Sequence, residues 1–155
     1  IPDSVTVFWF TYPVAAPGTQ APDRTVRNAV AVEGPKMRVL HIEDDGEFAE
    51  IVSQAVSPVA LTVNVSSLSE ARRALGGGAF DAVLLDWRLR DGDASDLLGL
   101  LEARMPDAHI ISLSADAERA QDERVACTII KGPAGLDRLL GELRIQQKIV
   151  TQGAA

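Results

Sequence analysis

The sequence predicts an α/β domain whose parallel sheet is covered by helices on both faces. Two observations predict this fold class. From residue 37 onward, short apolar runs alternate regularly with segments of helical period. Four of these five runs are largely apolar, as strands are when both faces of a parallel sheet are buried. The length of 155 residues gives room for one such domain with a substantial core.

Five segments have the length and composition of strands. Four are largely apolar, and one (LTVNV) alternates with a period of two, as a half-exposed strand does. In chain order they are MRVLHI at 37–42, LTVNV at 61–65, AVLL at 82–85, HIISL at 109–113 and CTII at 127–130. Strands separated by helices cannot pair as hairpins, so we expect them to run parallel.

Four segments have the apolar spacing of amphipathic helices. They are FAEIVSQAV at 48–56, SLSEARRAL at 67–75, SDLLGLLEAR at 95–104 and GLDRLLGELRIQQ at 135–147. The second begins with a capping box from Ser67 to Glu70 and is followed by three glycines, which favour a helix end. We predict a flexible tail at 148–155.

The first 36 residues differ in composition from the rest. Five of the eight prolines precede Met37, and the segment from 13 to 36 has neither helical nor strand period, so we expect an Ala/Pro-rich linker. Before it, SVTVFWFTY at 4–12 has the β-branched and aromatic content of a strand. A lone strand cannot bury its side chains, so this one requires a host sheet.

Charge and composition exclude several classes of function. The formal net charge of −7 argues against direct nucleic-acid binding, which needs a basic surface. No apolar run approaches the roughly 20 residues that cross a bilayer, so we expect no membrane contact by this segment. The single cysteine, Cys127, excludes an internal disulfide framework and fits a reducing, cytoplasmic location.

Polar side chains directly follow four of the five predicted strands. They are Glu43, Asp44 and Asp45 after the first strand, Asp86 after the third, Ser114 after the fourth and Lys131 after the fifth. Taken singly, each is explained as a solvated turn, a helix cap or a surface group. Ligands of parallel α/β sheets bind at the carboxyl ends of the strands, so the joint placement indicates a site. Oxygen ligands without His or Cys favour Mg²⁺, and a lysine with a hydroxyl suits a phosphoryl group.

Four segments in this order resemble the receiver domain of two-component response regulators. They are VLHIEDD, VLLDWRL, ISLSA and IIK, and the resemblance covers a domain at 37–147. It implies a three-layer flavodoxin-like (βα)5 receiver fold with sheet order 2-1-3-4-5. It also implies membership of a phosphorelay, with phosphoryl received from a phosphohistidine on a histidine kinase or histidine phosphotransfer protein. Such a receiver catalyses its own phosphorylation and dephosphorylation.

The resemblance assigns the acidic residues to a phosphoacceptor and its metal. Asp86 matches the phosphoacceptor aspartate. Glu43 and Asp44 match the acidic pair that binds Mg²⁺ together with Asp86, and Arg88 would add its backbone carbonyl. Asp45 is an additional acid beside the pair and a candidate modulator. A cation is needed because a carboxylate and a phosphoryl group are both anionic.

The remaining matches concern the switch side of the site. Lys131 matches the invariant lysine, and Ser114 the switch Ser/Thr. Thr128 stands where the family usually has a switch aromatic, so the coupled swing of a ring is not expected. We also hypothesise that Arg88 contacts Asp116 and tunes water attack on the phosphoryl group.

The sequence departs from the family pattern near the lysine. Gly132 separates Lys131 from Pro133, so the Lys131–Gly132 bond is expected to be trans, and the position of the lysine head is an open question. Only 17 positions separate Ser114 from Lys131. The family's fourth helix, which lies between the fourth and fifth strands, is therefore predicted to be shortened here, within ADAERAQDERVA at 115–126. The usual dimer through helix 4, strand 5 and helix 5 is therefore not expected. Arg90 replaces a proline that is common in the family.

The N-terminal VFWFTYPVAAP resembles the final strand and linker of the ATP-binding domain of sensor histidine kinases. This order implies the C-terminal receiver of a hybrid histidine kinase; the alternative is an extension before a start at Met37.

Two other functions compete with the phosphoacceptor. One is a degenerate receiver that acts as an unphosphorylated interaction module. The other is a haloacid-dehalogenase-type hydrolase, against which Arg88 argues, because those enzymes need an aspartate at this position.

Overall fold

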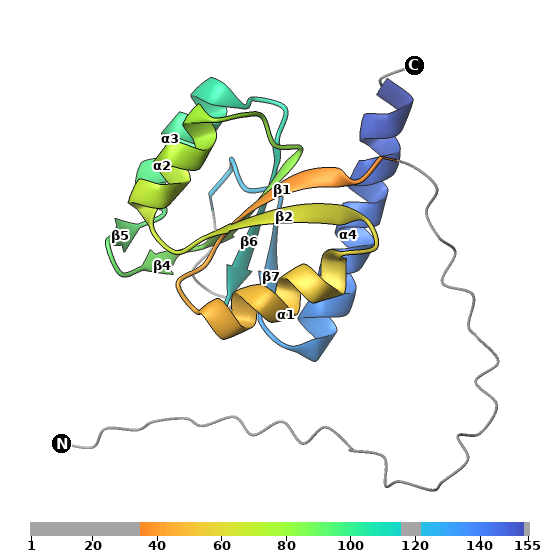
Figure 1. The fold of residues 1–155 in the computed structure, drawn as a ribbon, viewed down its shortest axis with the longest axis horizontal. Helices are drawn as coiled ribbons and strands as arrows, with labels where there is room; N and C mark the ends of the chain where they lie inside the picture. The colour runs from red at the N-terminus through yellow and green to blue at the C-terminus, as the bar shows by residue number, and fades with distance from the viewer. Residues whose placement is uncertain (1–34, 116–121, 154–155) are drawn as a thin grey trace, which may run out of the picture. The chain divides into compact units, whose positions relative to one another are not determined.

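The computed structural model describes residues 35–115 and 122–153, which form a five-stranded parallel sheet with helices on both faces. The sheet order is β2-β1-β3-β6-β7 (Figure 1). Its strands are β1 (Met37–Ile42), β2 (Ala60–Val65), β3 (Ala82–Asp86), β6 (His109–Ser114) and β7 (Cys127–Ile130). All five predicted strands are confirmed within one or two residues, and the predicted order 2-1-3-4-5 is confirmed too.

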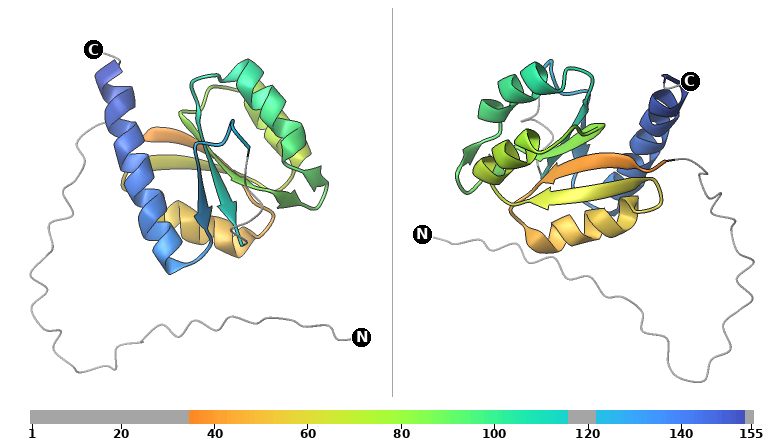
Figure 2. Two further views of the ribbon diagram at one scale, coloured as in Figure 1. Left: turned by 180° about the vertical axis from the view of Figure 1, so that it is seen from behind. Right: turned by 45° about the horizontal axis from the view of Figure 1, so that its top comes forward.

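Four helices flank the sheet within the described residues. They are α1 (Gly46–Val56), α2 (Leu68–Gly76), α3 (Ser95–Arg104) and α4 (Pro133–Gly153). Helices α1 and α4 cover one face and α2 and α3 the other, as the two further views show (Figure 2). This is the three-layer arrangement that the sequence predicts.

Each face of the sheet buries its own apolar cluster. On the α2/α3 face, Leu40, Leu85 and Leu98 are fully buried. On the α1/α4 face, Leu84 and Leu143 are fully buried. Neighbouring residues 84 and 85 point to opposite faces because side chains alternate along a strand. The central strand β3 is therefore buried on both sides, which holds its last residue, Asp86, in a fixed position.

Two helix starts, those of α1 and α2, follow capping residues in the sequence. Asp45 caps α1 by accepting hydrogen bonds from the N–H groups of Glu47 and Phe48 at 3.0 and 3.1 Å. Ser67 caps α2 by accepting from the N–H of Glu70 at 3.2 Å. The return bond of the predicted capping box goes elsewhere, because the Glu70 carboxylate accepts from the N–H and hydroxyl of Ser66.

A small hairpin that was not expected from the sequence follows Asp86. Strands β4 (Arg88–Leu89) and β5 (Gly92–Asp93) pair antiparallel. The turn residue Asp91 accepts hydrogen bonds from the N–H groups of Leu68 and Ser69, which begin α2. Gly92 has φ +147°, where a side chain would be strained. The hairpin therefore links the segment after Asp86 to the start of α2.

The C-terminal boundary was predicted wrongly. A flexible tail was expected from residue 148, but α4 continues as a helix to Gly153. Gln147 is buried on this helix and donates a hydrogen bond to the carbonyl of Pro35 at 3.0 Å, next to the start of β1. The helix is therefore anchored close to the segment that was assigned to the tail.

Several expectations concern residues outside the described ranges. They are the strand at 4–12, the linker, Asp116 and most of the shortened helix expected between β6 and β7. In the described part of that connection, residues 122–126 contain a turn and no helix. Among the described residues, no helix is both long and apolar enough to cross a membrane.

Candidate functional site

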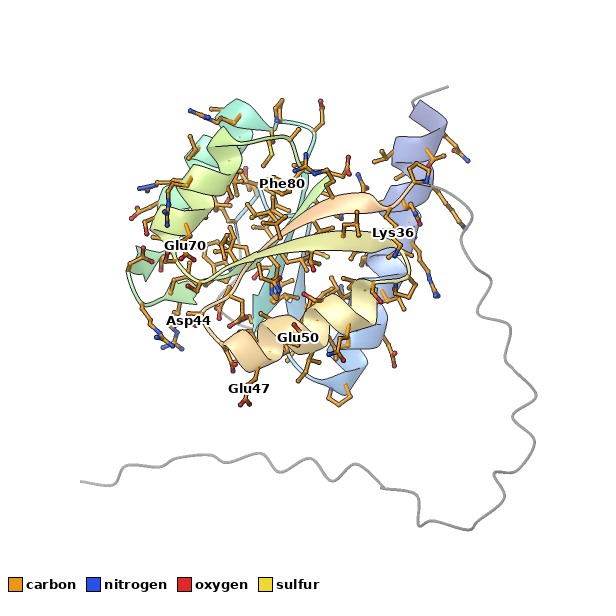
Figure 3. The ribbon with its side chains drawn as sticks, in the orientation of Figure 1. Lys36, Asp44, Glu47, Glu50, Glu70 and Phe80 are labelled. Carbon is orange, nitrogen blue, oxygen red and sulfur yellow. The ribbon has the colours of Figure 1, made fainter. Side chains whose placement is uncertain are left out.

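The strand register brings the predicted site residues to one edge of the sheet. Ile42 pairs with Leu85, Asp86 with Leu113, and Ser114 with Ile130. The residues that end or follow these strands therefore lie at the same level. In Figure 3, the labelled Asp44 marks this edge, and the labelled Phe80 lies at the opposite end of the sheet.

Lys131 joins two of the acids in an ion-paired triad. Its Nζ lies 2.7 Å from Glu43 Oε2 and 2.7 Å from Asp86 Oδ2. Glu43 is 2% exposed, so its carboxylate is almost completely removed from water. Asp86 uses its other oxygen to accept a hydrogen bond from the Arg88 N–H at 3.1 Å. Each carboxylate therefore already has a directional partner.

The extra glycine after Lys131 does not keep the lysine from the site. The Lys131–Gly132 bond is trans, as expected, and Gly132 has φ +144°. The Lys131 N–H donates to the Ser114 carbonyl at 2.8 Å, which ties the residue to the end of β6. The positive φ available to glycine turns the chain into α4 at once. The lysine head thus reaches both acids without a Lys-Pro bond.

Burial and charge act against each other in this triad. Burial raises the pKa of Glu43, and the Lys131 ammonium, which acts in the opposite direction, offsets only part of that rise. Burial lowers the pKa of Lys131, but its hydrogen bonds and charge interactions with Asp86 and Glu43 outweigh this, so the net shift is upward. Lys131 is therefore held as an ammonium ion.

Three carboxylates converge where a cation could bind. Glu43, Asp44 and Asp86 each offer an oxygen, and these atoms lie within 4.8 Å of one another. An oxygen-only donor set of this kind fits a hard divalent cation such as Mg²⁺. Arg88 follows Asp86 by two residues, and its carbonyl as a further ligand stays a prediction.

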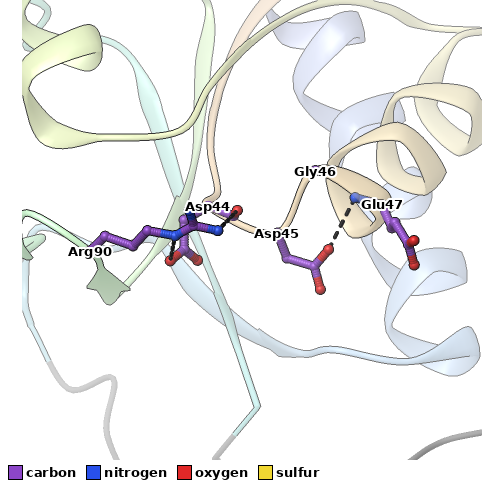
Figure 4. Close-up of a pocket in the computed structure, with 5 residues that line it drawn as sticks. All are labelled: Asp44, Asp45, Gly46, Glu47 and Arg90. Carbon is purple, nitrogen blue, oxygen red and sulfur yellow. Dashed lines mark hydrogen bonds and ion pairs between the residues drawn. The ribbon is translucent and has the colours of Figure 1, made fainter.

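The third acid of the EDD segment, Asp45, is not part of this cluster. Its carboxylate caps α1, while Asp44 faces Arg90, whose Nε lies 3.5 Å from Asp44 Oδ2 (Figure 4). The Arg90 Nη2 also donates to the Asp44 carbonyl at 3.4 Å. Arg90 and the acidic residues Asp44, Asp45 and Glu47 line an open pocket at this edge. The contact between Arg90 and Asp44 was not predicted from the sequence, where Arg90 was noted only because the family commonly has a proline at this position.

An aromatic residue also borders the triad. The Lys131 Nζ lies 4.9 Å from the centre of the Phe48 ring, in a cation–π contact. The Phe48 ring meets His41 edge-on at 6.5 Å. His41 is fully buried, and burial, with the Lys131 charge acting in the same direction, lowers its pKa to about 4. In the sequence, Phe48 is only the first residue of the predicted amphipathic helix at 48–56, and no local pattern there indicates a contact with Lys131.

The remaining predicted residues lie on β6 and β7 or outside the described ranges. Ser114 is buried, 6% exposed, at the end of β6. Thr128 lies on β7 opposite Ser112, before the end of the strand. The contact between Arg88 and Asp116 stays a hypothesis, because Asp116 is outside the described residues.

Comparison with known proteins supports the fold. No protein-family model matches the chain, and no curated protein matches it either. Among solved structures, it is similar to a CheY-like response regulator receiver domain from Methylobacillus flagellatus, with a TM-score of 0.62 and 20% identity. That alignment covers 70% of this chain and 99% of the other.

Two further similar structures contain a metal ion, one with BeF and one with a phosphorylated aspartic acid. The response regulator protein TrrA from Thermotoga maritima, in complex with Mg²⁺ and BeF, aligns with a TM-score of 0.64 and 19% identity over 71% of this chain and 98% of that one. A response regulator from Burkholderia pseudomallei with a phosphorylated aspartic acid, a calcium ion and citrate aligns with a TM-score of 0.63 and 21% identity, over 77% and 74%. The chain therefore has the flavodoxin-like fold of CheY-like receiver domains.

Proposed function

We propose that this protein is a phosphoacceptor receiver of a two-component phosphorelay, which takes a phosphoryl group on Asp86 in the presence of Mg²⁺. The observation that carries the proposal is the joint position of Asp86. One of its oxygens lies 2.7 Å from the Lys131 ammonium, and it forms part of a three-carboxylate cluster with Glu43 and Asp44. The similar structures with Mg²⁺–BeF or a phosphorylated aspartate support the same chemistry.

The residues have distinct roles in this reaction. An Asp86 oxygen attacks the phosphorus, an O–P bond forms, and the P–N bond to the donor imidazole breaks, leaving its electron pair on the nitrogen. Glu43 and Asp44, with Asp86, would hold Mg²⁺, which screens the repulsion between the two anions. Lys131 pairs with a phosphoryl oxygen as a movable point charge. Ser114 donates its hydroxyl to another oxygen and shifts the segment after β6.

The wider context of this function is also a proposal. The donor would be a histidine kinase or a histidine phosphotransfer protein. The resemblance of residues 7–17 to the end of a kinase ATP-binding domain supports a hybrid kinase. The short connection from Ser114 to Lys131 supports a receiver that does not form the usual dimer through helix 4, strand 5 and helix 5.

Phosphorylation by a small-molecule donor tests the proposal directly. The protein is incubated with Mg²⁺ and acetyl phosphate, and its intact mass is measured. We expect one added phosphoryl group in the wild type and none in Asp86→Asn. Asp45→Asn is the matched control, because asparagine still caps a helix and the mass gain should persist.

Beryllium fluoride provides a second measurement without a covalent step. Trp87 follows Asp86 directly and packs against the α2/α3 cluster, so its fluorescence should change when Mg²⁺ and beryllium fluoride bind. A Trp9→Phe background isolates this signal. If the wild type gives neither adduct nor fluorescence response, the phosphoacceptor proposal fails, and the degenerate interaction module becomes the better explanation.

A further inference from the structure

Lys131 lies between two acids and one aromatic ring, and the ring is not explained by the functions assigned above. The two carboxylates of Glu43 and Asp86 each lie 2.7 Å from Nζ. The Lys131 ammonium lies over the face of the Phe48 ring, with Nζ 4.9 Å from the ring centre. Ammonium ions bind aromatic faces because the ring carries negative charge density above its plane.

Several contacts fix the position of the Phe48 ring. The backbone N–H of Phe48 donates to Asp45 Oδ1 at 3.1 Å, so the helix cap places Phe48 in the first turn of α1. The ring packs against the α1/α4 cluster and meets His41 edge-on, with an angle of 68° between the planes. The ring is therefore supported both from the helix and from strand β1.

The Lys131 backbone, by contrast, offers limited control over its long side chain. The residue is followed by Gly132, the most permissive residue for backbone conformation. A lysine side chain has several rotatable bonds, and ordering them costs conformational entropy. A fixed partner close to Nζ reduces the number of positions available to the ammonium.

We propose that Phe48, supported by His41, is a positioning residue that holds the Lys131 ammonium at Asp86. This inference rests on the proposed function for its catalytic meaning. In that reaction Lys131 has to leave Glu43 for a phosphoryl oxygen, while Glu43 becomes available to a cation. An aromatic face attracts the ammonium without a hydrogen bond in a fixed direction. Phe48 thus keeps Lys131 at the site while its acidic partners change.

A double-mutant cycle on stability tests the contact without reference to phosphorylation. The variants are Phe48→Leu, Lys131→Leu and the double variant, and the unfolding equilibrium constant is measured in urea. Leucine replaces the lysine because a methionine sulfur would itself attract the ring. We expect Phe48→Leu to increase the unfolding constant about two- to tenfold more in the wild-type background than in the Lys131→Leu background, where the ammonium is missing. Additive effects would overturn the proposal.

An aromatic rescue distinguishes the ring from its apolar volume. Phe48→Tyr should retain the coupling to Lys131, whereas Phe48→Leu should lose it. In NMR spectra of the wild type and of Phe48→Tyr, the Lys131 methylene next to Nζ should resonate upfield of other lysines, because Nζ lies over the face of the ring, where the ring current shields nearby protons. The shift should disappear in Phe48→Leu. This measurement needs no Lys131 variant, so it decides the question even if Lys131→Leu does not fold; an unshifted wild-type resonance refutes the proposal.

The catalytic consequence is measured with acetyl phosphate and Mg²⁺. Phe48→Leu should accept the phosphoryl group about two- to tenfold more slowly, and Phe48→Tyr at close to the wild-type rate. An unchanged rate in Phe48→Leu would refute the positioning role. A wild type that takes no phosphoryl group while the coupling persists would instead refute the proposed function alone, so the two failures are distinguishable.

Discussion

Removal of the Lys131 charge should destabilise the protein and increase its dependence on divalent cations. Lys131→Leu leaves Glu43 and Asp86 close together without their shared ammonium, and the Glu43 side chain is only 1% exposed. Breaking a fully buried ion pair costs about 3–5 kcal/mol. The Lys131 and Asp86 side chains are 20% and 17% exposed, so solvent screens part of the effect, and we expect a loss of about 2 kcal/mol at pH 7.

The pH dependence of this loss follows from Glu43. Burial already raises the pKa of Glu43 in the wild type, and without Lys131 the main opposing influence is gone. The folded variant then binds a proton that the unfolded chain has released, so its stability falls as the pH rises above the ordinary glutamate pKa. Lowering the pH from 7 towards 5 should therefore recover part of the lost stability in the variant.

Urea unfolding followed by circular dichroism measures both effects. With a slope of about 1–3 kcal/mol per molar urea, a loss of about 2 kcal/mol lowers the midpoint by about 1 M. Mg²⁺ should raise the midpoint more in the variant than in the wild type, because no ammonium competes for Glu43 and Asp86. Equal midpoints at pH 7, or the same Mg²⁺ response in both proteins, would refute this account of the triad.

Three further predictions concern the residues around the triad. Arg90→Ala should strengthen Mg²⁺ binding about two- to fivefold at low salt and less at high salt, because Arg90 is an exposed ion-pair partner of Asp44. Titration calorimetry measures the Mg²⁺ affinity, and weaker binding by the variant would contradict this role of Arg90. Asp45→Ala should cost about 1 kcal/mol through the lost helix cap and leave Mg²⁺ affinity unchanged, whereas Asp44→Asn should reduce that affinity more than about tenfold. His41, with its pKa lowered to about 4, should stay neutral in NMR titrations down to about pH 5. The free energy of unfolding should fall as the pH drops from 6.5 towards 4, since the unfolded chain binds the proton first. Titration of His41 near pH 6.5 would contradict the burial of this ring.

Much of the fold could be predicted because its signals are local. The segment at 82–85 is apolar throughout, and the structure buries all four of its residues completely. Ser67 is a helix cap in the sequence and in the structure. The boundary at 148 failed for a tertiary reason, since α4 is long and its Gln147 is held by the Pro35 carbonyl, a partner 112 positions away in the chain.

The candidate site was predicted as a set of residue types at strand ends. Parallel strands place their carboxyl ends at one edge, so Glu43, Asp86 and Lys131 could be grouped without any knowledge of their distances. The family resemblance assigned Asp44, and not Asp45, to the metal-binding pair, but residue type and spacing alone could not separate them, because both are acids in the same short loop. The start of α1 at Gly46 separates them: Asp45 becomes the cap, and Asp44 turns toward the cluster.

The sequence by itself determined the order of the elements, the edge at which the polar residues gather and the identity of the acid at the end of β3. These follow from periodicity and from the alternation of strands and helices, which are properties of neighbouring residues. Only the tertiary structure decided that Lys131 reaches Asp86 behind its extra glycine, and that Phe48 lies against the ammonium. Those contacts depend on how β7 and α1 are placed relative to β1 and β3, and no local pattern encodes the direction of two side chains 83 positions apart.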